Sequence, residues 1–449
     1  MIFRAGMCML GLISALAGAP AHAQTIRLGN SALVAASETD RGLYEPHLAI
    51  NPTNPSHLLA ASIVSGGTAG TFAERQDRQR CAAFLSLDAG ATWTRHDFAT
   101  TWCADPWVVL TPDGQALVTM SAAHASLPEQ GHNGLLAFRS IDGGRTWDEK
   151  PIGLGRNHDH PTMAIDLSTG PRRGWIYLSS HRPTRAEDGR ERYGVYLARS
   201  RDGGKSFDDP AYVVVNNLHN LPEMPVVLAD GTLFESFVDA CHPTDTGGTT
   251  VPASVDGACF ERRRAWVVRS NDGGHSFSPP LFVNDACGPP PGYRLSAFAG
   301  DISSAPFAGR LYFACREKGG GSIVVNHSRD RGETWTAPVA VRSATADSAV
   351  GGRIPALAVS TRGVVTVAWI EANGRAGGQC AERVYLSASQ DGGRSFSPGQ
   401  LVSETAGCGT GGDYFGLIAT PDGRFRLLWS EPRDGVDQLR TVTIDIEGA

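Results

Sequence analysis

One eight-residue pattern recurs six times along the chain and restricts its possible folds more than any other feature. The pattern reads Ser-x-Asp-x-Gly-x-Thr/Ser-Trp/Phe. Its copies begin at Ser86, Ser140, Ser200, Ser270, Ser328 and Ser389, which gives spacings of 54, 60, 70, 58 and 61 residues. Repeats of this length are typical of propeller blades or solenoid units, in which one small structural unit is built many times.

The residue types in the pattern are those of a hairpin turn. A short Asp side chain can accept hydrogen bonds from backbone N–H groups of its own turn. The Gly supplies a backbone angle that a Cβ atom would resist, and the closing aromatic residue contributes buried area between units. We therefore interpret the six aspartates as residues that stabilise the turns and not as catalytic groups. They are Asp88, Asp142, Asp202, Asp272, Asp330 and Asp391.

A second element, an apolar strand usually introduced by an acidic residue, precedes each copy and occurs once more near the C-terminus. Its seven copies begin at Glu45, Asp105, Asp159, Glu223, Asp301, Arg353 and Asp413. The last unit lacks an outer strand, which residues 25–34 can supply, and such a closure removes exposed sheet edges. The sequence thus predicts an all-β propeller with seven four-stranded antiparallel blades. Six blades remain the alternative if the unit at Asp301 is not a blade.

The N-terminal residues have the three parts of a secretory signal peptide. Arg4 is basic, residues 7–17 are apolar, and Ala21-His22-Ala23 is a small-x-small cleavage sequence. We expect cleavage near Ala23, a single propeller domain over residues 24–449, and a secreted or periplasmic protein. No later segment is apolar for long enough to span a membrane. The formal net charge of −6 argues against a nucleic-acid partner, which usually requires a basic face.

Eight cysteines remain after residues 1–23 are removed, and an even number in an exported chain indicates disulfide bonds. They lie in or beside the long connections on the face where the innermost strands begin. Sequential pairing would link neighbouring loops on that face: Cys81 with Cys103, Cys241 with Cys259, Cys287 with Cys315, and Cys380 with Cys408. Spacing alone leaves other pairings open. The acidic residues that open the innermost strands are expected to converge around the axis on this same face.

The repeated turns and the order of the elements resemble the sialidase superfamily, whose turns are called Asp-boxes, over essentially the whole mature chain. Arg353-Ile-Pro is similar to the family's Arg-Ile-Pro blade, whose Arg grips the substrate carboxylate, and the strand at Tyr414 is similar to the strand of its nucleophilic Tyr. The resemblance implies a catalytic set of Arg353, Tyr414, Arg316, Arg294, Glu371 and Glu223. In this chain the Arg strand is not the first, Tyr414 follows Arg353, and residues 373–383 lack the family's acid/base Asp.

Several alternatives stay open at this point. The ring of Glu45, Asp105, Asp159, Asp301 and Asp413 could bind calcium, which prefers oxygen ligands, or supply paired carboxylates for glycoside hydrolysis. His158 and His160 flank Asp159 on one strand face and could ligate a metal or act as acid and base, although solvent-facing loop histidines are the simpler interpretation. The favoured function is a glycan-active hydrolase, with exo-α-sialidase as one activity. The alternatives are a polysaccharide lyase and a non-catalytic module that binds a glycan or a protein.

Overall fold

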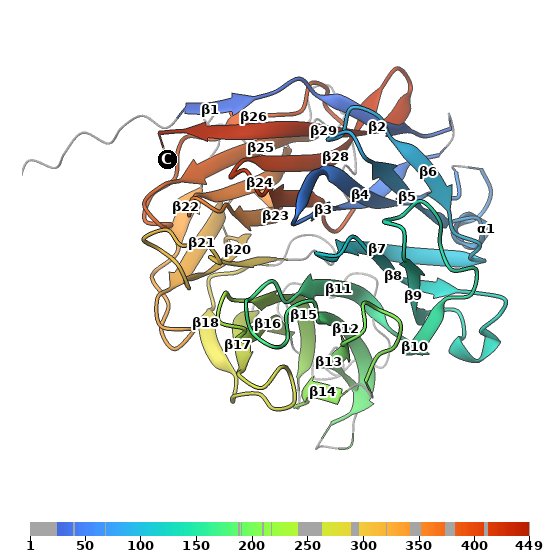
Figure 1. The fold of residues 1–449 in the computed structure, drawn as a ribbon, viewed down its shortest axis with the longest axis horizontal. Coiled ribbons are helices and arrows are strands. Elements are labelled where there is room, and N and C mark those ends of the chain that lie inside the picture. The colour runs from blue at the N-terminus through green and yellow to red at the C-terminus, as the bar shows by residue number, and fades with distance from the viewer. Residues whose placement is uncertain are drawn as a thin grey trace, which may run out of the picture.

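The computed structural model describes residues 25–448 except 39–40, 68, 187–188, 190, 209–210, 217, 241–262, 289–295, 320, 342–351, 373–381 and 408–411. The predicted signal peptide at 1–23, the two cysteine pairs Cys241–Cys259 and Cys380–Cys408, and Arg294 lie wholly or partly outside these residues. The described chain forms seven antiparallel sheets arranged around a common centre, as Figure 1 shows. The predicted seven-bladed, all-β propeller is confirmed.

The first three blades follow the chain in order. Blade 1 contains β3 (Leu43–Asn51), β4 (Asn54–Val64), β5 (Arg80–Ser86) and β6 (Thr94–Asp97). Blade 2 contains β7 (Trp102–Leu110), β8 (Ala116–Ala123), β9 (Gly134–Ser140) and β10 (Ile152–Arg156). Blade 3 contains β11 (Asp159–Ile165), β12 (Ile176–Arg185), β13 (Glu191–Ser200) and β14 (Ala211–Val214). Two short helices, α1 (Phe72–Asp77) and the 3₁₀ helix η1 (Pro128–Gln130), lie in connections.

The next three blades repeat the same order. Blade 4 contains β15 (His219–Val227), β16 (Leu233–Ala240), β17 (Arg264–Ser270) and β18 (Leu281–Asn284). Blade 5 contains β19 (Ala297–Gly300), β20 (Leu311–Arg316), β21 (Ile323–Ser328) and β22 (Val339–Val341). Blade 6 contains β23 (Gly352–Val359), β24 (Val365–Ala372), β25 (Glu382–Ser389) and β26 (Gln400–Leu401). The unit that contains Asp301 is thus a true blade, which excludes the six-bladed alternative.

Blade 7 is built from both ends of the chain. Its inner strands are β27 (Gly416–Ala419), β28 (Phe425–Arg433) and β29 (Val436–Glu447), and β29 pairs with β1 (Thr25–Leu28) and β2 (Ala32–Ala36). The N-terminal strand therefore completes the last blade, as predicted. Each innermost strand contacts the next one, and β27 contacts β3, so the ring is closed.

The hydrophobic core lies between neighbouring blades. One cluster joins Leu59 and Leu85 of blade 1 to Val118 and Phe138 of blade 2, and equivalent clusters follow around the ring. Each blade thus buries one face against the next, and this interblade packing holds the start of every inner strand in place.

The repeated turns are held by the hydrogen bonds that their residue types predict. In blade 2 the Asp142 carboxylate accepts hydrogen bonds from the backbone N–H of Thr146 (2.9 Å) and from the Ser140 hydroxyl (2.8 Å). The Ser140 hydroxyl oxygen in turn accepts the N–H of Gly144 (2.7 Å), which has a φ of 93°. Partial burial acts to raise the pKa of Asp142, but these hydrogen bonds lower it to about 2. The carboxylate is therefore committed to the turn.

Two disulfide bonds link neighbouring blades. Cys81 of β5 is bonded to Cys103 of β7, and Cys287, which follows β18, is bonded to Cys315 of β20. Both were predicted by sequential pairing. Each is expected to contribute about 2–4 kcal/mol to stability and to hold adjacent blades together near the face where the inner strands begin.

Candidate functional site

Irregular residues interrupt five of the seven inner strands at the same place. The pairing with the second strand shifts in β3, β7, β11, β15 and β23, which leaves two residues of each inner strand outside the ladder. The first of the two is Glu45, Asp105, His160, Glu223 and Ile354, respectively. All but Glu223 have a positive φ, between 48° and 52°. Such bulges redirect side chains, and strained backbone of this kind gathers at functional sites.

The bulges correct the predicted alignment of the acidic residues. Glu45, Asp105 and Glu223 occupy equivalent positions, but the blade 3 residue at that position is His160 and not Asp159. Asp159 lies one residue earlier, in the ladder opposite His181, and Arg353 holds the same earlier position opposite Ile370. The sequence contained a signal for this offset, since a proline follows Glu45, Asp105, His160 and Ile354 directly.

Asp301 does not belong to the site, and its predicted position was wrong. It follows β19 at the end opposite the bulges, in the turn toward β20. Its backbone N–H donates to the carbonyl of Arg310 (2.8 Å), and its carboxylate accepts the N–H of Ser303 (2.9 Å). Asp301 is therefore a turn residue on the far side of the blade. The error arose because an acidic residue beside an apolar run can stand at either end of a strand.

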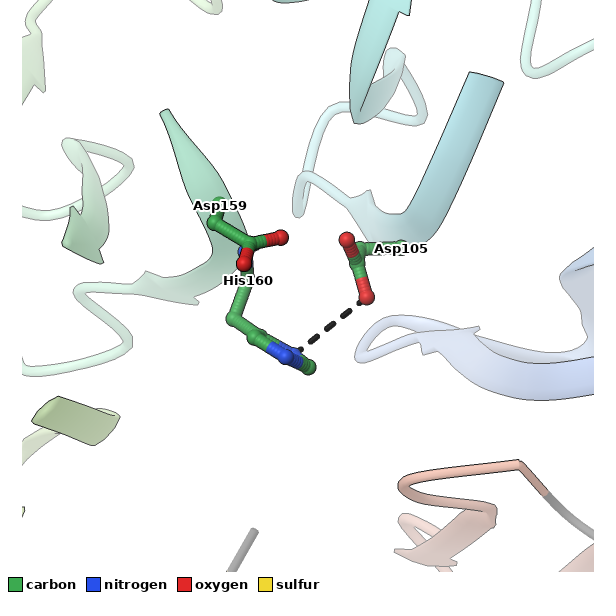
Figure 2. Close-up of side chains that lie close together, drawn as sticks. All are labelled: Asp105, Asp159 and His160. Carbon is green, nitrogen blue, oxygen red and sulfur yellow. Dashed lines mark hydrogen bonds and ion pairs between the residues drawn. The ribbon is translucent and has the colours of Figure 1, made fainter. Parts of the chain in front are cut away.

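Four elements bring acidic groups together around the His160 imidazole. His160 Nδ1 lies 3.3 Å from the Asp105 carboxylate, and His160 Nε2 lies 3.6 Å from the Asp413 carboxylate. One ligand atom each of Asp105, Asp159 and His160 lies within 4.8 Å of the others. Figure 2 shows Asp105 of β7 facing Asp159 and His160, which stand together at the start of β11. The predicted convergence of the strand openings is thus seen for blades 1, 2, 3 and 7.

The carboxyl groups of this cluster, Glu45, Asp105, Asp159 and Asp413, have different protonation tendencies. Burial raises the pKa of Asp105 well above its usual value, and the neighbouring Asp159 and Asp413 carboxylates raise it further. The pKa of Glu45 is raised for the same reasons, namely burial and the nearby carboxylates of Asp105 and Asp413. Burial also acts to raise the pKa of Asp159, but His160 and His181 outweigh it and lower that pKa. Asp159 is therefore ionised where Asp105 keeps its proton.

Exposure separates the same two residues. The Asp159 side chain is 51% exposed, whereas that of Asp105 is 5% exposed. His181 Nε2 lies 3.4 Å from the second carboxylate oxygen of Asp159, and the Tyr193 ring packs edge-on against His181 with ring centroids 4.8 Å apart. An ionised, accessible carboxylate thus stands in front of a covered, protonated one. His181 and Tyr193 were not predicted, because their approach to Asp159 depends on the register in which β11, β12 and β13 pair within blade 3.

Tyr414, the predicted nucleophile, lies with these carboxylates but is buried. Its hydroxyl donates to the carbonyl of Pro106 (3.1 Å), and its ring lies 5.4 Å from that of Trp107. Burial and the carboxylates of Glu45 and Asp105 raise the pKa of Tyr414 well above its usual value. These surroundings disfavour a phenolate. The hydrogen bond instead fixes the bulge that carries Asp105.

Side-chain hydrogen bonds tie blades 1, 2 and 3 together beneath the cluster. His47 stacks on Trp107 at 3.6 Å and accepts the backbone N–H of Val108 on Nδ1 (3.3 Å). Trp107 in turn donates its indole N–H to the carbonyl of Met163 (3.2 Å). Burial lowers the pKa of His47 to about 3, so this ring stays a neutral acceptor. The backbone around Asp105 is therefore held from both sides.

Two of the predicted arginines, Arg353 and Arg316, lie on blades 6 and 5. Arg353 forms an ion pair with Glu382 of β25, while Glu371 of β24 accepts the indole N–H of Trp369 (3.2 Å). Arg316 is half-buried at the end of β20, beside Cys315. The structure thus places Tyr414 with the carboxylates and Arg353 with Glu382.

Glu223 is buried in blade 4, where its carboxylate accepts the backbone N–H of Ser296 (2.5 Å). Burial raises its pKa to about 7, although Arg263 and the Ser296 N–H oppose the shift. Its neighbour Glu235 on β16 is also buried, and burial raises its pKa well above the usual value. Blade 4 therefore carries two buried acids beside the cluster, of which sequence analysis found only Glu223.

We expect Glu223→Gln to stabilise the protein at neutral pH but not at pH 4. The folded state binds the Glu223 proton up to about pH 7, whereas the unfolded chain releases it near 4.5. Stability is therefore lost as the pH rises between these values, by about 3 kcal/mol in total. Urea unfolding at pH 4 and pH 8 measures the difference. The control is Glu333→Gln, whose side chain is 51% exposed. The prediction would be wrong if the free energy of unfolding changed equally between pH 4 and pH 8 in the wild type and in Glu223→Gln.

Asp105, Asp159 and His160 also present the ligand atoms that a divalent metal ion would need. Two carboxylates and an imidazole suit a transition metal, whereas calcium prefers six or more oxygen ligands. The predicted calcium ring also loses Asp301, which lies at the other end of its blade. The chemistry of the donor set therefore fits calcium less well than the sequence implied.

Fold and site together define a seven-bladed propeller with a carboxylate cluster at the openings of its inner strands. No family model matches the chain. A sialidase of Micromonospora viridifaciens is 26% identical over 244 residues, which cover 53% of this chain and 29% of that protein. The match thus spans less than a third of that relative's length. It confirms the predicted resemblance to the sialidase superfamily of propellers.

Solved structures share the fold at lower identity. A protein of unknown function from Dyadobacter fermentans has a TM-score of 0.53 at 14% identity, with 94% of this chain and 99% of that chain covered. An α-L-arabinofuranosidase variant from Fusarium graminearum, in complex with an iminosugar inhibitor, has a TM-score of 0.51 at 14% identity. That match covers 81% of this chain and 98% of the enzyme.

In the part of the chain that the structure describes, no helix combines the length and apolar character that a membrane crossing requires.

Proposed function

We propose that the protein is a glycoside hydrolase whose reactive pair is Asp159 and Asp105. The observation that carries the proposal is a pair of adjacent carboxyl groups, one exposed and one covered, whose surroundings shift their pKa values in opposite directions. Environments that push two pKa values apart are the usual way to assign an acid and a base or nucleophile. The sialidase relative and the arabinofuranosidase neighbour support a glycan as the substrate class.

The separation of the pair favours retention of configuration. One oxygen of each carboxyl group lies within 4.8 Å of the other. Inverting glycosidases need about 6.5–9.5 Å to hold a water molecule, whereas retaining ones need about 5–5.5 Å. The 4.8 Å limit lies below the separation of an inverting pair, and the hydrogen bond that joins Asp105 to Asp159 would have to open to admit the glycosidic bond.

In the first step a carboxylate oxygen of Asp159 forms a bond to the anomeric carbon. The glycosidic C–O bond breaks, and Asp105 gives its proton to the leaving oxygen. In the second step the Asp105 carboxylate takes a proton from water, whose oxygen bonds to the anomeric carbon and releases Asp159. His160 and His181 hold Asp159 ionised, while Tyr414 holds the Asp105 bulge through Pro106.

Export is part of the proposal. Two disulfide bonds in the described residues favour an oxidising compartment, and the residues at 1–23 have the pattern of a signal peptide. Mass spectrometry of the N-terminus of the mature protein tests this part.

We expect the wild-type protein to hydrolyse 4-nitrophenyl glycosides with retention and to keep its activity in EDTA, because the acid pair acts without a metal. Proton NMR of the first sugar released, before mutarotation, reads the configuration. An inverted product would overturn the assignment of Asp159 as nucleophile. Loss of activity in EDTA, with recovery on adding a transition metal, would show that the Asp105–Asp159–His160 group works as a metal site. Saturable glycan binding without turnover would indicate a binding module.

A further inference from the structure

We propose that the site accepts neutral sugars and rejects sugars that carry a carboxylate. The inference rests on the proposed glycoside hydrolase and adds its substrate class. It is carried by the distribution of charge at the mouth of the ring: acidic groups surround the reacting position, and the arginine predicted to grip a carboxylate has an acidic partner.

A substrate that enters the site would first meet the accessible carboxylates of Asp159 and Asp413. Asp159 is half-exposed at the mouth, and Asp413 is partly exposed behind it, with His160 between Asp413 and Asp105. A carboxylate on the sugar would have to approach these groups in a partly dehydrated site, where like charges repel more strongly than in water. A neutral sugar meets no such repulsion, and its hydroxyl groups can donate hydrogen bonds to the same oxygens.

Two arginines of the described residues, Arg353 and Arg263, already have acidic neighbours. Recognition of a carboxylate usually uses a guanidinium group that presents two N–H donors to it. Arg353 is paired with Glu382, and both side chains are largely covered at 16% and 10% exposure. Arg263 of blade 4 is also buried, with the Glu223 carboxyl group nearby. An anionic substrate would therefore have to share Arg353 with a carboxylate that already occupies part of its guanidinium group.

An aromatic ring beside the reactive carboxylate fits a sugar ring of this class. Tyr193 is 36% exposed and packs on His181, which holds Asp159. The apolar face of a sugar can lie against an aromatic ring, and this contact needs no charge on the sugar. Tyr193 thus supplies a contact that is available to neutral substrates at the position where the chemistry would occur.

The test compares neutral and anionic substrates on the same wild-type protein. We expect 4-nitrophenyl glycosides of neutral pentoses and hexoses to include the best substrate. Its kcat/KM should exceed that of 4-nitrophenyl glucuronide and of the 4-methylumbelliferyl glycoside of sialic acid by at least about 10-fold. A preference for either anionic substrate would overturn the inference and leave the hydrolase proposal intact.

A binding measurement separates failure of the inference from failure of the hydrolase proposal. Arabinobiose, glucuronic acid and sialic acid are added separately at equal concentrations, and the shift in melting temperature is recorded. If no glycoside is cleaved, the hydrolase proposal fails. A larger shift with arabinobiose then still supports a preference for neutral sugars, and a larger shift with either acid, or no shift with any sugar, overturns it.

The variant Glu382→Gln tests the arginine argument directly. It removes the acidic partner of Arg353 but keeps a side chain of similar shape. We expect it to raise the anionic-to-neutral ratio of kcat/KM, or of binding, by about 10-fold, since Arg353 can then meet the substrate carboxylate. Glu404→Gln, at the exposed partner of Arg433, is the matched control. An unchanged ratio in a Glu382→Gln protein with wild-type melting behaviour would contradict the role given to this ion pair.

Discussion

Asp159→Asn is expected to lower kcat roughly 10⁴-fold on every substrate that the wild type cleaves, because an amide cannot replace the attacking carboxylate. The side chain keeps its size and its place opposite His181, so the melting temperature should change little. Initial rates with 4-nitrophenyl glycosides measure the loss. Added azide should restore part of the rate and yield the inverted glycosyl azide, since the small anion can enter where the carboxylate stood.

A covalent adduct identifies the attacking residue independently of rates. A 2-deoxy-2-fluoro glycoside with a good leaving group should label the wild type, and peptide mapping should place the label on Asp159. Asp97→Asn, whose side chain is 59% exposed on β6, serves as the control and should keep wild-type rates. Labelling of Tyr414 would reject the assignment and restore the nucleophile implied by the sialidase resemblance.

Asp105→Asn is expected to lower kcat by about 10²–10⁴-fold on glycosides with poor leaving groups and far less on 2,4-dinitrophenyl glycosides. A good leaving group departs without a proton, so only the poor ones need the acid. Burial and the neighbouring Asp159 raise the pKa of Asp105, so wild-type activity should persist well above the usual range for aspartate. It should then fall as the pH rises further and Asp105 loses its proton, a fall that the variant should lack.

Glu223→Gln provides the decisive comparison for the proton donor. Burial raises the pKa of Glu223 to about 7, a value that also suits a general acid. If Asp105→Asn keeps its activity on glycosides with poor leaving groups while Glu223→Gln loses activity on those glycosides alone, then Glu223, and not Asp105, is the proton donor. Melting temperatures of both variants at the assay pH that are no lower than that of the wild type would show that neither loss reflects unfolding.

The fold could be predicted because its information is local and repeated. Each turn such as Ser140–Trp147 carries its own hydrogen-bonding groups, and each innermost strand is a short apolar run beside it. Neither depends on knowing which blades meet. The closure of blade 7 could be predicted by counting strands, since the last repeat unit lacked its fourth strand and residues 25–34 had the pattern of a strand.

The site was predictable only in part, because its geometry depends on where strands are irregular. The acidic openings of blades 1, 2, 3 and 7 were found, but a one-residue shift exchanged Asp159 and His160 between two positions. Asp301 was misplaced because composition does not distinguish the two ends of a four-residue strand. His181 and Tyr193 lie on the second and third strands of blade 3 and reach Asp159 through strand register within that blade, whereas Glu235 lies on the second strand of blade 4.

The pairing of β1 with β29 has a consequence for how the molecule is made. Thr25 pairs in register with Glu447, so β1 must wait for a strand that is synthesised after the six intervening blades. During synthesis both unfinished edges can join other chains. Shielding of the first strand until β29 has been made should therefore raise the yield of native protein.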